Sequence, residues 1–325
     1  MLSDDSAERT TVAFIGGHGR SGSTLLCRLL EGLDGVCSVG ELRNLWDNGV
    51  LKDYDCACGK PFSQCDFWSK VGVEAFGGWD PETARRALVL RRRVDRLRSV
   101  PQLVAASGDF AAAADEYAAL IASVYRAAAA VSGARVIVDS SKLPSTGYLM
   151  SRSTALDPRV VHLVRDSRGV AFSWTKVVQR GDSDRTMARS APTRTAVRWG
   201  AFNALTAFLG RRGLPKTTVR YEDLIAAPAD ELARLADFLD VPLAPGALDF
   251  VSGETVELPV DHSVWGNPVR SASGPQRLRL DEAWRTGLTG SQRRLVTVLS
   301  LPGLVRYGYL TGRPRTADRA VVPHA

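Results

Sequence analysis

Short apolar runs alternate with longer stretches of helical periodicity along most of this chain. The runs over 11–15, 33–39, 135–138, 159–164 and 217–221 are bounded by glycine or polar residues, which is typical of buried strands. Between them, leucine, alanine and aromatic residues recur every three or four positions and predict helices. Strands that alternate with helices indicate an α/β fold with a central parallel sheet, which binds ligands at the carboxyl ends of its strands.

The same pattern predicts a single domain over residues 1–312. Helices are expected over 23–30, 41–50, 81–100, 111–131, 193–210 and 228–239. We interpret 50–130 as a helical insertion that lies over the sheet and shapes the acceptor side, and 181–192 as a polar loop. Residues 313–325 are expected to form a flexible tail.

The stretch after the first predicted strand is rich in glycine and leads directly into a helix. Gly16, Gly17, Gly19 and Gly22 let the backbone turn sharply and bring its amides close to a ligand. The helix that begins at Ser23 adds unpaired amides and its dipole, and both attract an anion. This arrangement therefore predicts a phosphate site in a P-loop-like three-layer fold.

The loop differs from the P-loop of nucleotide triphosphatases, GxxxxGK[ST], in its cation. Gly17 and Gly22 keep the glycine spacing, but Ser23 stands where the lysine is expected. The cation of this loop is instead Arg20, two residues before Gly22. The missing lysine weighs against a nucleotide triphosphatase without identifying the phosphate ligand.

A second cation with a nearby hydroxyl stands at the end of a later strand. Arg165 directly follows the strand 159–164, and Ser173 comes eight residues later, in the next predicted helix. An arginine fork and a serine hydroxyl suit a phosphomonoester, because both donate hydrogen bonds to its oxygens. The alternative, an arginine paired with Asp166 and a buried serine, requires no ligand.

Together, the two motifs resemble the donor site of sulfotransferases that use 3′-phosphoadenosine 5′-phosphosulfate (PAPS). The run R-S-G-S-T-L at 20–25 resembles their 5′-phosphosulfate loop. The run R-D-S-R-G-V-A-F-S at 165–173 resembles their 3′-phosphate motif, with Ser167 where proline is common. The resemblance covers residues 11–270 and is strongest to the tyrosylprotein branch and to the bacterial carbohydrate and small-molecule branches. It implies an α/β enzyme that binds PAPS, and the product 3′-phosphoadenosine 5′-phosphate (PAP), along the carboxyl edge of its sheet.

The resemblance also implies which residues hold the donor. The amides of 19–24 would bind its 5′ end, and Tyr221, in the run V-R-Y-E-D-L, would face the adenine. Arg270 ends the run G-N-P-V-R, which closes over the nucleotide in bacterial members, and would add a cation near the 3′-phosphate. The donor-binding residues expected on this basis are Gly19, Arg20, Ser21, Gly22, Ser23, Thr24, Arg165, Ser173, Tyr221 and Arg270.

The same likeness implies the catalytic residues. Glu41, 21 residues after Arg20, matches the general base of the tyrosylprotein branch, and Lys142 matches the strand-end lysine near the phosphosulfate. The histidine base of the cytosolic branch is replaced here by Pro144. We therefore expect Glu41 to take the proton of the acceptor, while Arg20 and Lys142 stabilise the leaving phosphate oxygen. Asp139 is the alternative base, and no metal is expected to take part.

Two other functions stay open at this point. The apolar run that ends at Asp139 resembles a Walker B strand, which would make the protein a magnesium-dependent P-loop kinase or NTPase. The missing lysine after Gly22 and the 3′-phosphate motif, which no ATP enzyme needs, weigh against this function. A non-catalytic nucleotide-binding protein would keep both phosphate sites, and Glu41 would then perform no chemistry.

Three of the five cysteines lie close together in the chain. Five cysteines in 325 residues do not form a disulfide framework. Cys56, Cys58 and Cys65 lack the fourth ligand of a structural zinc site, which a distant histidine could supply. A labile disulfide is a second alternative, and loop packing anchored by Phe67 and Trp68 is the simplest interpretation.

Composition and charge narrow the class of partner. The net charge of +7 suits a polyanionic ligand, whereas the dispersed cations and the absence of an RNA motif argue against nucleic acid. The polar residues 1–10 and the lack of a long apolar run predict a cytoplasmic protein without a membrane span. The expected partner is a small-molecule or carbohydrate acceptor, or a glycolipid, and the oligomeric state stays open, with a homodimer as one alternative.

Overall fold

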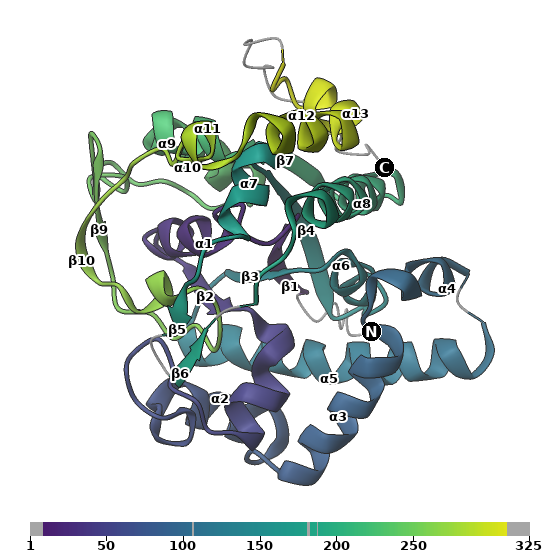
Figure 1. The fold of residues 1–325 in the computed structure, drawn as a ribbon. Coiled ribbons are helices and arrows are strands. Elements are labelled where there is room, and N and C mark those ends of the chain that lie inside the picture. Colours follow the sequence, from purple (N-terminus) through teal and green to yellow (C-terminus); the bar gives the residue numbers. More distant parts are fainter. Residues whose placement is uncertain (1–8, 106, 181–182, 187, 311–325) are drawn as a thin grey trace.

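The computed structural model describes residues 9–105, 107–180, 183–186 and 188–310, and a five-stranded parallel sheet lies at its centre (Figure 1). Its strands are β1 (Thr10–Gly16), β2 (Val36–Gly40), β3 (Val136–Lys142), β4 (Leu156–Val164) and β7 (Lys216–Arg220). They lie in the order β2-β3-β1-β4-β7, and each neighbouring pair is parallel. The predicted α/β fold with a central parallel sheet is confirmed.

The order of the strands determines where the loops at their carboxyl ends meet. From β1 the chain passes to β2 at one edge, returns to β3 beside β1, and then crosses to β4 on the other side. The order therefore reverses around β1, which is where open parallel sheets bind ligands. The glycine loop, Lys142 and Arg165 stand at the carboxyl ends of β1, β3 and β4.

Helices cover both faces of the sheet, and successive residues of β1 point to opposite faces. Phe14 packs in a core formed with α2 (Asp66–Phe76), α3 (Pro81–Val94), α5 (Gly108–Ser132) and α6 (Pro144–Met150). Ile15 packs in a second core formed with α1 (Ser23–Glu31), α9 (Tyr221–Ala226), α10 (Pro228–Phe238) and β9 (Thr255–Leu258). Figure 1 shows α3 and α5 on one side of the sheet and α9 and α10 on the other.

The remaining elements surround this centre. Between β4 and the last helices the chain also forms a two-stranded and a three-stranded antiparallel sheet. The elements are α4 (Val100–Ala105), α7 (Ser167–Ser173), β5 (Gln179–Arg180), β6 (Ser183–Thr186), α8 (Pro192–Arg211), β8 (Val251–Ser252), β10 (Gly274–Arg277), α11 (Trp284–Gly287), α12 (Gly290–Leu299) and α13 (Leu301–Arg306), with short 3₁₀ turns at Leu42–Asn44, Phe62–Gln64, Leu97–Ser99 and Pro268–Ser271.

Three predicted segments differ from the observed ones. The helix expected over 81–100 ends at Val94, and Pro101 lies in the first turn of α4, where a proline without an N–H costs nothing. The stretch 41–50 forms a 3₁₀ turn followed by a π-helical segment, Leu45–Leu51. The expected loop over 181–192 contains part of the β5–β6 hairpin, and the tail predicted over 313–325 lies outside the described residues.

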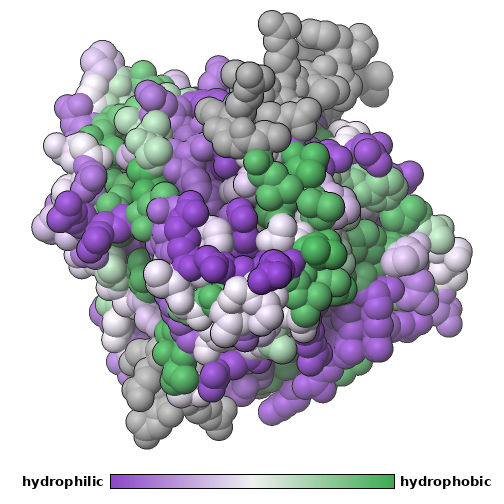
Figure 2. Space-filling view, turned by 45° about the horizontal axis from the view of Figure 1, so that its top comes forward, coloured by the Kyte–Doolittle hydropathy of each residue, from purple (hydrophilic) through white to green (hydrophobic). Residues whose placement is uncertain are grey.

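The exposed face drawn in Figure 2 mixes hydrophilic and hydrophobic residues. Large hydrophobic side chains that are exposed within the described residues include Leu295 and Val298 on α12 and Val305 on α13. Among the described helices, none is both long and apolar enough to cross a membrane.

Candidate active site

A cavity of about 520 Å³ lies at the carboxyl edge of the sheet. The glycine loop, the ends of β3 and β4, the start of α9 and the segment from β9 to just past β10 contribute to its wall. Of the site residues predicted from the sequence, those that line the cavity are Gly19, Arg20, Gly22, Ser23, Thr24, Glu41, Lys142, Arg165, Ser173 and Tyr221. The fold therefore brings the predicted donor loop, the predicted 3′-phosphate motif and the predicted base together.

The glycine loop leaves the start of α1 open to the cavity. Gly22 is the N-cap of α1, with φ of 94°, and no side chain caps the helix there. A Cβ at this position would lie 2.5 Å from the ring of Tyr221, so both the backbone angle and the lack of space require glycine. The amides of the first turn have no partner inside the helix, and they can bind an anion at the cavity wall.

Two side chains hold the loop in place. The indole Nε1 of Trp174 donates a hydrogen bond to the carbonyl oxygen of Gly19 at 3.1 Å, and Arg165 Nη1 donates to the carbonyl oxygen of Arg20 at 3.3 Å. The Arg20 guanidinium also lies 5.6 Å from the centre of the Trp174 ring. Arg20 itself has φ of 70°, a strained angle for a residue with a side chain. These contacts keep the Arg20 side chain at the cavity.

The charged side chains that line the cavity are mostly cations. Among the described residues these are Arg20, Lys142, Arg165, Arg277 and Arg279, against the single carboxylate of Glu41. A concave wall with this balance of charge attracts anions and focuses its field on the enclosed space. The cavity is therefore suited to a ligand that carries several negative charges.

Glu41 and Lys142 form an ion pair at the cavity wall. Lys142 Nζ lies 2.6 Å from Glu41 Oε1 and donates a second hydrogen bond to the Ser140 carbonyl oxygen at 2.8 Å. The other carboxylate oxygen of Glu41 accepts from Asn44 Nδ2 at 3.1 Å. Lys142 has φ of 67°, so the chain leaves β3 in a conformation that turns sharply at the site. Both side chains are thus held in position, and each carboxylate oxygen keeps a lone pair for a further proton donor.

Arg165 lies at the centre of a second polar group. Its guanidinium lies 4.5 Å from the centre of the Tyr221 ring, and Nη2 lies 3.2 Å from Asp281 Oδ2. Because α7 begins two residues later and turns back over the sheet, Ser173 at its last position also reaches the cavity. Arginine, serine and tyrosine therefore line the same cavity as the glycine loop.

Three residues that the sequence suggested for the site do not line the cavity. Arg270 is buried and donates to the carbonyl oxygens of Ser263 at 3.0 Å and Asp55 at 2.8 Å, and it does not line the cavity. Ser21 is buried beneath the loop and does not line the cavity either. Asp139 is fully buried, accepts a hydrogen bond from Tyr125, and its pKa is raised to about 6 by burial.

Several lining residues were not expected to form the site. Trp174, Trp265, Arg277 and Arg279 line the cavity although none of them belongs to a position that the motifs define. Arg277 ends β10, and Arg279 lies two residues beyond the strand. Neither arginine belongs to a motif that would have singled it out in the sequence.

His18 in the glycine loop links the stability of the protein to pH. Its ring packs edge-on against Phe202, and burial, reinforced by the charges of Arg198 and Lys142, lowers its pKa to about 4. The unfolded chain, with an ordinary histidine pKa near 6.5, binds this proton first, so the fold loses stability as the pH falls from about 6.5 towards 4. We expect His18→Asn to remove about 2 kcal/mol of the difference in unfolding free energy between pH 7 and pH 5.

Urea unfolding of the two proteins at both pH values measures this effect. If the variant keeps the pH dependence of the wild-type protein, His18 is not the group that titrates.

A model of the sulfotransferase family matches residues 13–245, well over half of the chain. The chain therefore belongs to the sulfotransferase family, as the motifs predicted. A search of curated proteins found no match.

Three solved structures are similar to this chain. The sulfotransferase domain from the curacin biosynthetic pathway is 20% identical over 90% of this chain and 98% of the domain, with a TM-score of 0.46. The sulfotransferase domain from the Synechococcus PCC 7002 olefin synthase is 21% identical over 92% and 96%, with a TM-score of 0.48. Retinol dehydratase in complex with androsterone and the inactive cofactor PAP is 15% identical over 91% and 80%, with a TM-score of 0.35.

Proposed function

We propose that this protein transfers a sulfuryl group from PAPS to a hydroxyl of a small-molecule, carbohydrate or glycolipid acceptor. One observation carries the proposal: the open start of α1, the Arg165–Ser173 pair and the Glu41–Lys142 ion pair all line the same cationic cavity. The first two groups suit the two phosphate-bearing ends of the donor, and the third supplies a base and a cation. Membership of the sulfotransferase family supports this reaction.

The donor has two ends that need different partners. The amides at the start of α1, with Arg20, Ser23 and Thr24, are proposed to bind the 5′-phosphosulfate. Arg165 and Ser173 are proposed to donate hydrogen bonds to the 3′-phosphate, and Tyr221 to pack against the adenine. Arg270 donates to two backbone carbonyl oxygens. We therefore propose that it holds the 261–270 segment in place and does not contact the 3′-phosphate.

The transfer is proposed to follow an in-line displacement. The acceptor oxygen attacks sulfur, the bond from sulfur to the 5′-phosphate oxygen breaks, and PAP leaves with the electrons of that bond. Glu41 takes the proton of the attacking hydroxyl through one of its carboxylate oxygens, and Arg20 and Lys142 stabilise the charge on the leaving oxygen. These steps use the side chains of the chain itself, with no metal.

The alternative functions have weaker support. A P-loop kinase would use Asp139 as its magnesium ligand, but this carboxylate is fully buried, accepts from Tyr125 and the amide of Ser141, and does not line the cavity. The same burial makes Asp139 a poor candidate for the base. A non-catalytic nucleotide-binding protein has no need for the ion pair of Glu41 with Lys142.

The acceptor is proposed only by class. None of the described residues in 50–130 lines the cavity, although Tyr54 stacks on the lining residue Trp265, so the role of this region towards the acceptor stays a prediction. We also propose that residues 1–312 form a single domain, that the protein is cytoplasmic, and that its partner is not a nucleic acid.

A transfer assay tests the proposed reaction. Sulfur-labelled PAPS is incubated with the full-length protein and a panel of phenols, hydroxylated metabolites, sugars and glycolipids. We expect label to move to the hydroxyl of at least one acceptor and PAP to form in equal amount. Consumption of ATP with the same panel, and no transfer from PAPS, would contradict the proposal.

A further inference from the structure

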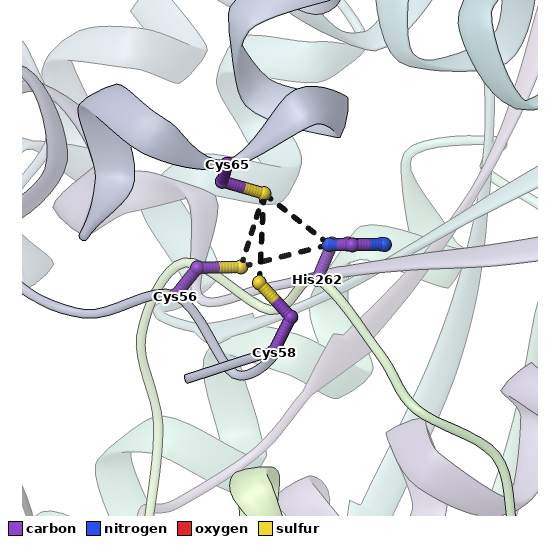
Figure 3. A group of neighbouring side chains, drawn as sticks. All are labelled: Cys56, Cys58, Cys65 and His262. Atoms are coloured by element: carbon purple, nitrogen blue, oxygen red, sulfur yellow. Dashed lines mark hydrogen bonds between the residues drawn. The ribbon is translucent and has the colours of Figure 1, made fainter. Parts of the chain in front are cut away.

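The three cysteines of the segment 56–65 meet a histidine that lies far away in the chain (Figure 3). Cys56, Cys58, Cys65 and His262 each offer one ligand atom, and these four atoms all lie within 4.8 Å of one another. The four side chains converge on a common centre, and they come from the loop before α2 and from the segment after β9. We propose that this group is a structural zinc site that stabilises the fold.

The distances agree with tetrahedral coordination of zinc. The Sγ atom of Cys65 lies 3.6 Å from that of Cys56 and 3.8 Å from that of Cys58. Nδ1 of His262 lies 3.3 Å from Cys65 Sγ and 3.8 Å from Cys56 Sγ. A zinc ion with bonds of about 2.3 Å to sulfur and about 2.05 Å to nitrogen places neighbouring sulfurs about 3.8 Å apart and sulfur about 3.6 Å from nitrogen.

The backbone around the cysteines is folded to present them to one point. The amide of Gly59 donates to the carbonyl oxygen of Cys56 at 3.0 Å, which closes a tight turn that contains Cys58. Gly59 has φ of 83°, an angle that requires glycine there. Cys65 stands at the N-cap of α2, so the first turn of this helix fixes the third thiol.

His262 is oriented by packing on the same segment. Its ring stacks on Phe67 with centroids 5.1 Å apart, and the indole of Trp68 donates to the His262 carbonyl oxygen at 2.7 Å. Phe67 and Trp68, which the sequence suggested as anchors of a packed loop, therefore hold the histidine whose Nδ1 faces the thiols. The fourth ligand that the spacing of the cysteines lacks comes from 197 residues further along the chain than Cys65.

Chemistry favours zinc over the other interpretations of the cluster. Three thiolates and one imidazole in a tetrahedral arrangement are a set that structural zinc sites use, and soft sulfur ligands disfavour magnesium and calcium. Each of the five cysteines is a free thiol, and the Sγ atoms of the cluster lie well beyond the roughly 2.05 Å of a disulfide bond. Packing alone would not need four ligand atoms to face one another, two of them on buried residues.

The zinc site would join a segment of the cavity wall to the segment that carries the cysteines. Trp265, Gly266 and Asn267, which follow His262 closely, line the cavity. Beside the cluster, Arg270 donates to the carbonyl oxygen of Asp55, the residue before Cys56. Zinc binding would therefore hold the 261–270 segment against the segment that carries the cysteines, and its loss should loosen that wall. This last consequence rests on the proposed PAPS site, whereas the metal site itself does not.

Metal analysis of the full-length protein, purified without a histidine tag, tests the site. We expect about one zinc ion per chain by plasma mass spectrometry, and thiolate-to-cobalt charge-transfer absorption when Co²⁺ replaces zinc. Cys58→Ser, which changes the most exposed thiol of the cluster, should weaken Co²⁺ and Zn²⁺ binding by at least about 10–100-fold. Replacing a residue that only hydrogen-bonds to a metal ligand already lowers metal affinity by that factor. Cys37→Ser, at a buried thiol outside the cluster, is the matched control and should keep the full metal content.

The outcomes separate the alternatives. A protein that contains no zinc and shows no thiolate absorption with Co²⁺ overturns the site, as does a disulfide between cluster cysteines in the purified protein. Because the Co²⁺ titration is made on the wild-type chain, the test stands even if Cys58→Ser fails to fold. A zinc-loaded protein that does not bind PAP would keep the metal site and contradict only the proposed donor.

Discussion

Glu41→Gln is expected to lower sulfuryl transfer by about 10²–10⁴-fold while PAP binds almost as tightly as to the wild-type protein. The amide keeps the size of the side chain: its oxygen can still accept from Lys142, and its Nε2 can donate to Asn44 once the Asn44 amide turns to present its oxygen. It cannot take the proton of the attacking hydroxyl. Single-turnover rates with saturating PAPS, together with a PAP titration, measure the two quantities separately.

The control for this change is a glutamate in a similar ion pair outside the site. Glu116 pairs with Arg86 at 2.6 Å, is exposed, and does not line the cavity. Glu116→Gln should therefore leave both the transfer rate and PAP binding unchanged. Retention of more than about a tenth of the transfer rate in Glu41→Gln would show that another group is the base.

Arg165→Ala is expected to weaken PAP by about 10–150-fold relative to adenosine 5′-phosphate, a ligand that differs from PAP only in lacking the 3′-phosphate. A charge-assisted hydrogen bond to a phosphate is worth roughly 1.5–3 kcal/mol. The comparison of two ligands is necessary because Arg165 also donates to the Arg20 carbonyl, so its loss can loosen the loop for both. Titration calorimetry of the two nucleotides with wild-type and variant protein gives the ratio.

Arg168 offers the matched control on the same turn of chain. It is ion-paired with Asp166 at 2.6 Å and does not line the cavity. Arg168→Ala should therefore keep the ratio of the two affinities, even if it lowers stability. Equal losses of PAP and adenosine 5′-phosphate in Arg165→Ala would remove this arginine from the 3′-phosphate site.

The sequence predicted those parts of the site that depend on local patterns. An apolar strand, a glycine loop and a helix start are adjacent in the chain, so this pattern alone predicted an anion site at the loop that contains Arg20 and Gly22, and the resemblance added Thr24. Arg165 was found because it directly follows a predicted strand, whereas Lys142 was implied by the resemblance to sulfotransferases. The parallel sheet gathers both at the carboxyl edge. The fold class followed from the same alternation.

Other features depend on contacts that no local pattern records. Arg270 satisfies the motif, yet its guanidinium is directed to two carbonyls because the 261–270 segment packs on the loop that carries Asp55. The wall formed by Trp174 and Arg279 arises from how α7 and β10 are placed in space. His262 similarly joins the three cysteines only through the fold. The end of α3 at Val94 was missed because Pro101, predicted to stop this helix, lies instead in the first turn of α4.

Titration calorimetry of the wild-type protein shows whether the cavity binds a nucleotide with a 3′-phosphate. PAP and magnesium-ATP are titrated separately into the full-length chain under the same conditions. We expect one PAP to bind per chain, at least about tenfold more tightly than magnesium-ATP, since a charge-assisted 3′-phosphate contact is worth roughly 1.5–3 kcal/mol. Magnesium-ATP that binds as tightly as PAP, or PAP that does not bind at all, would contradict the proposed 3′-phosphate site.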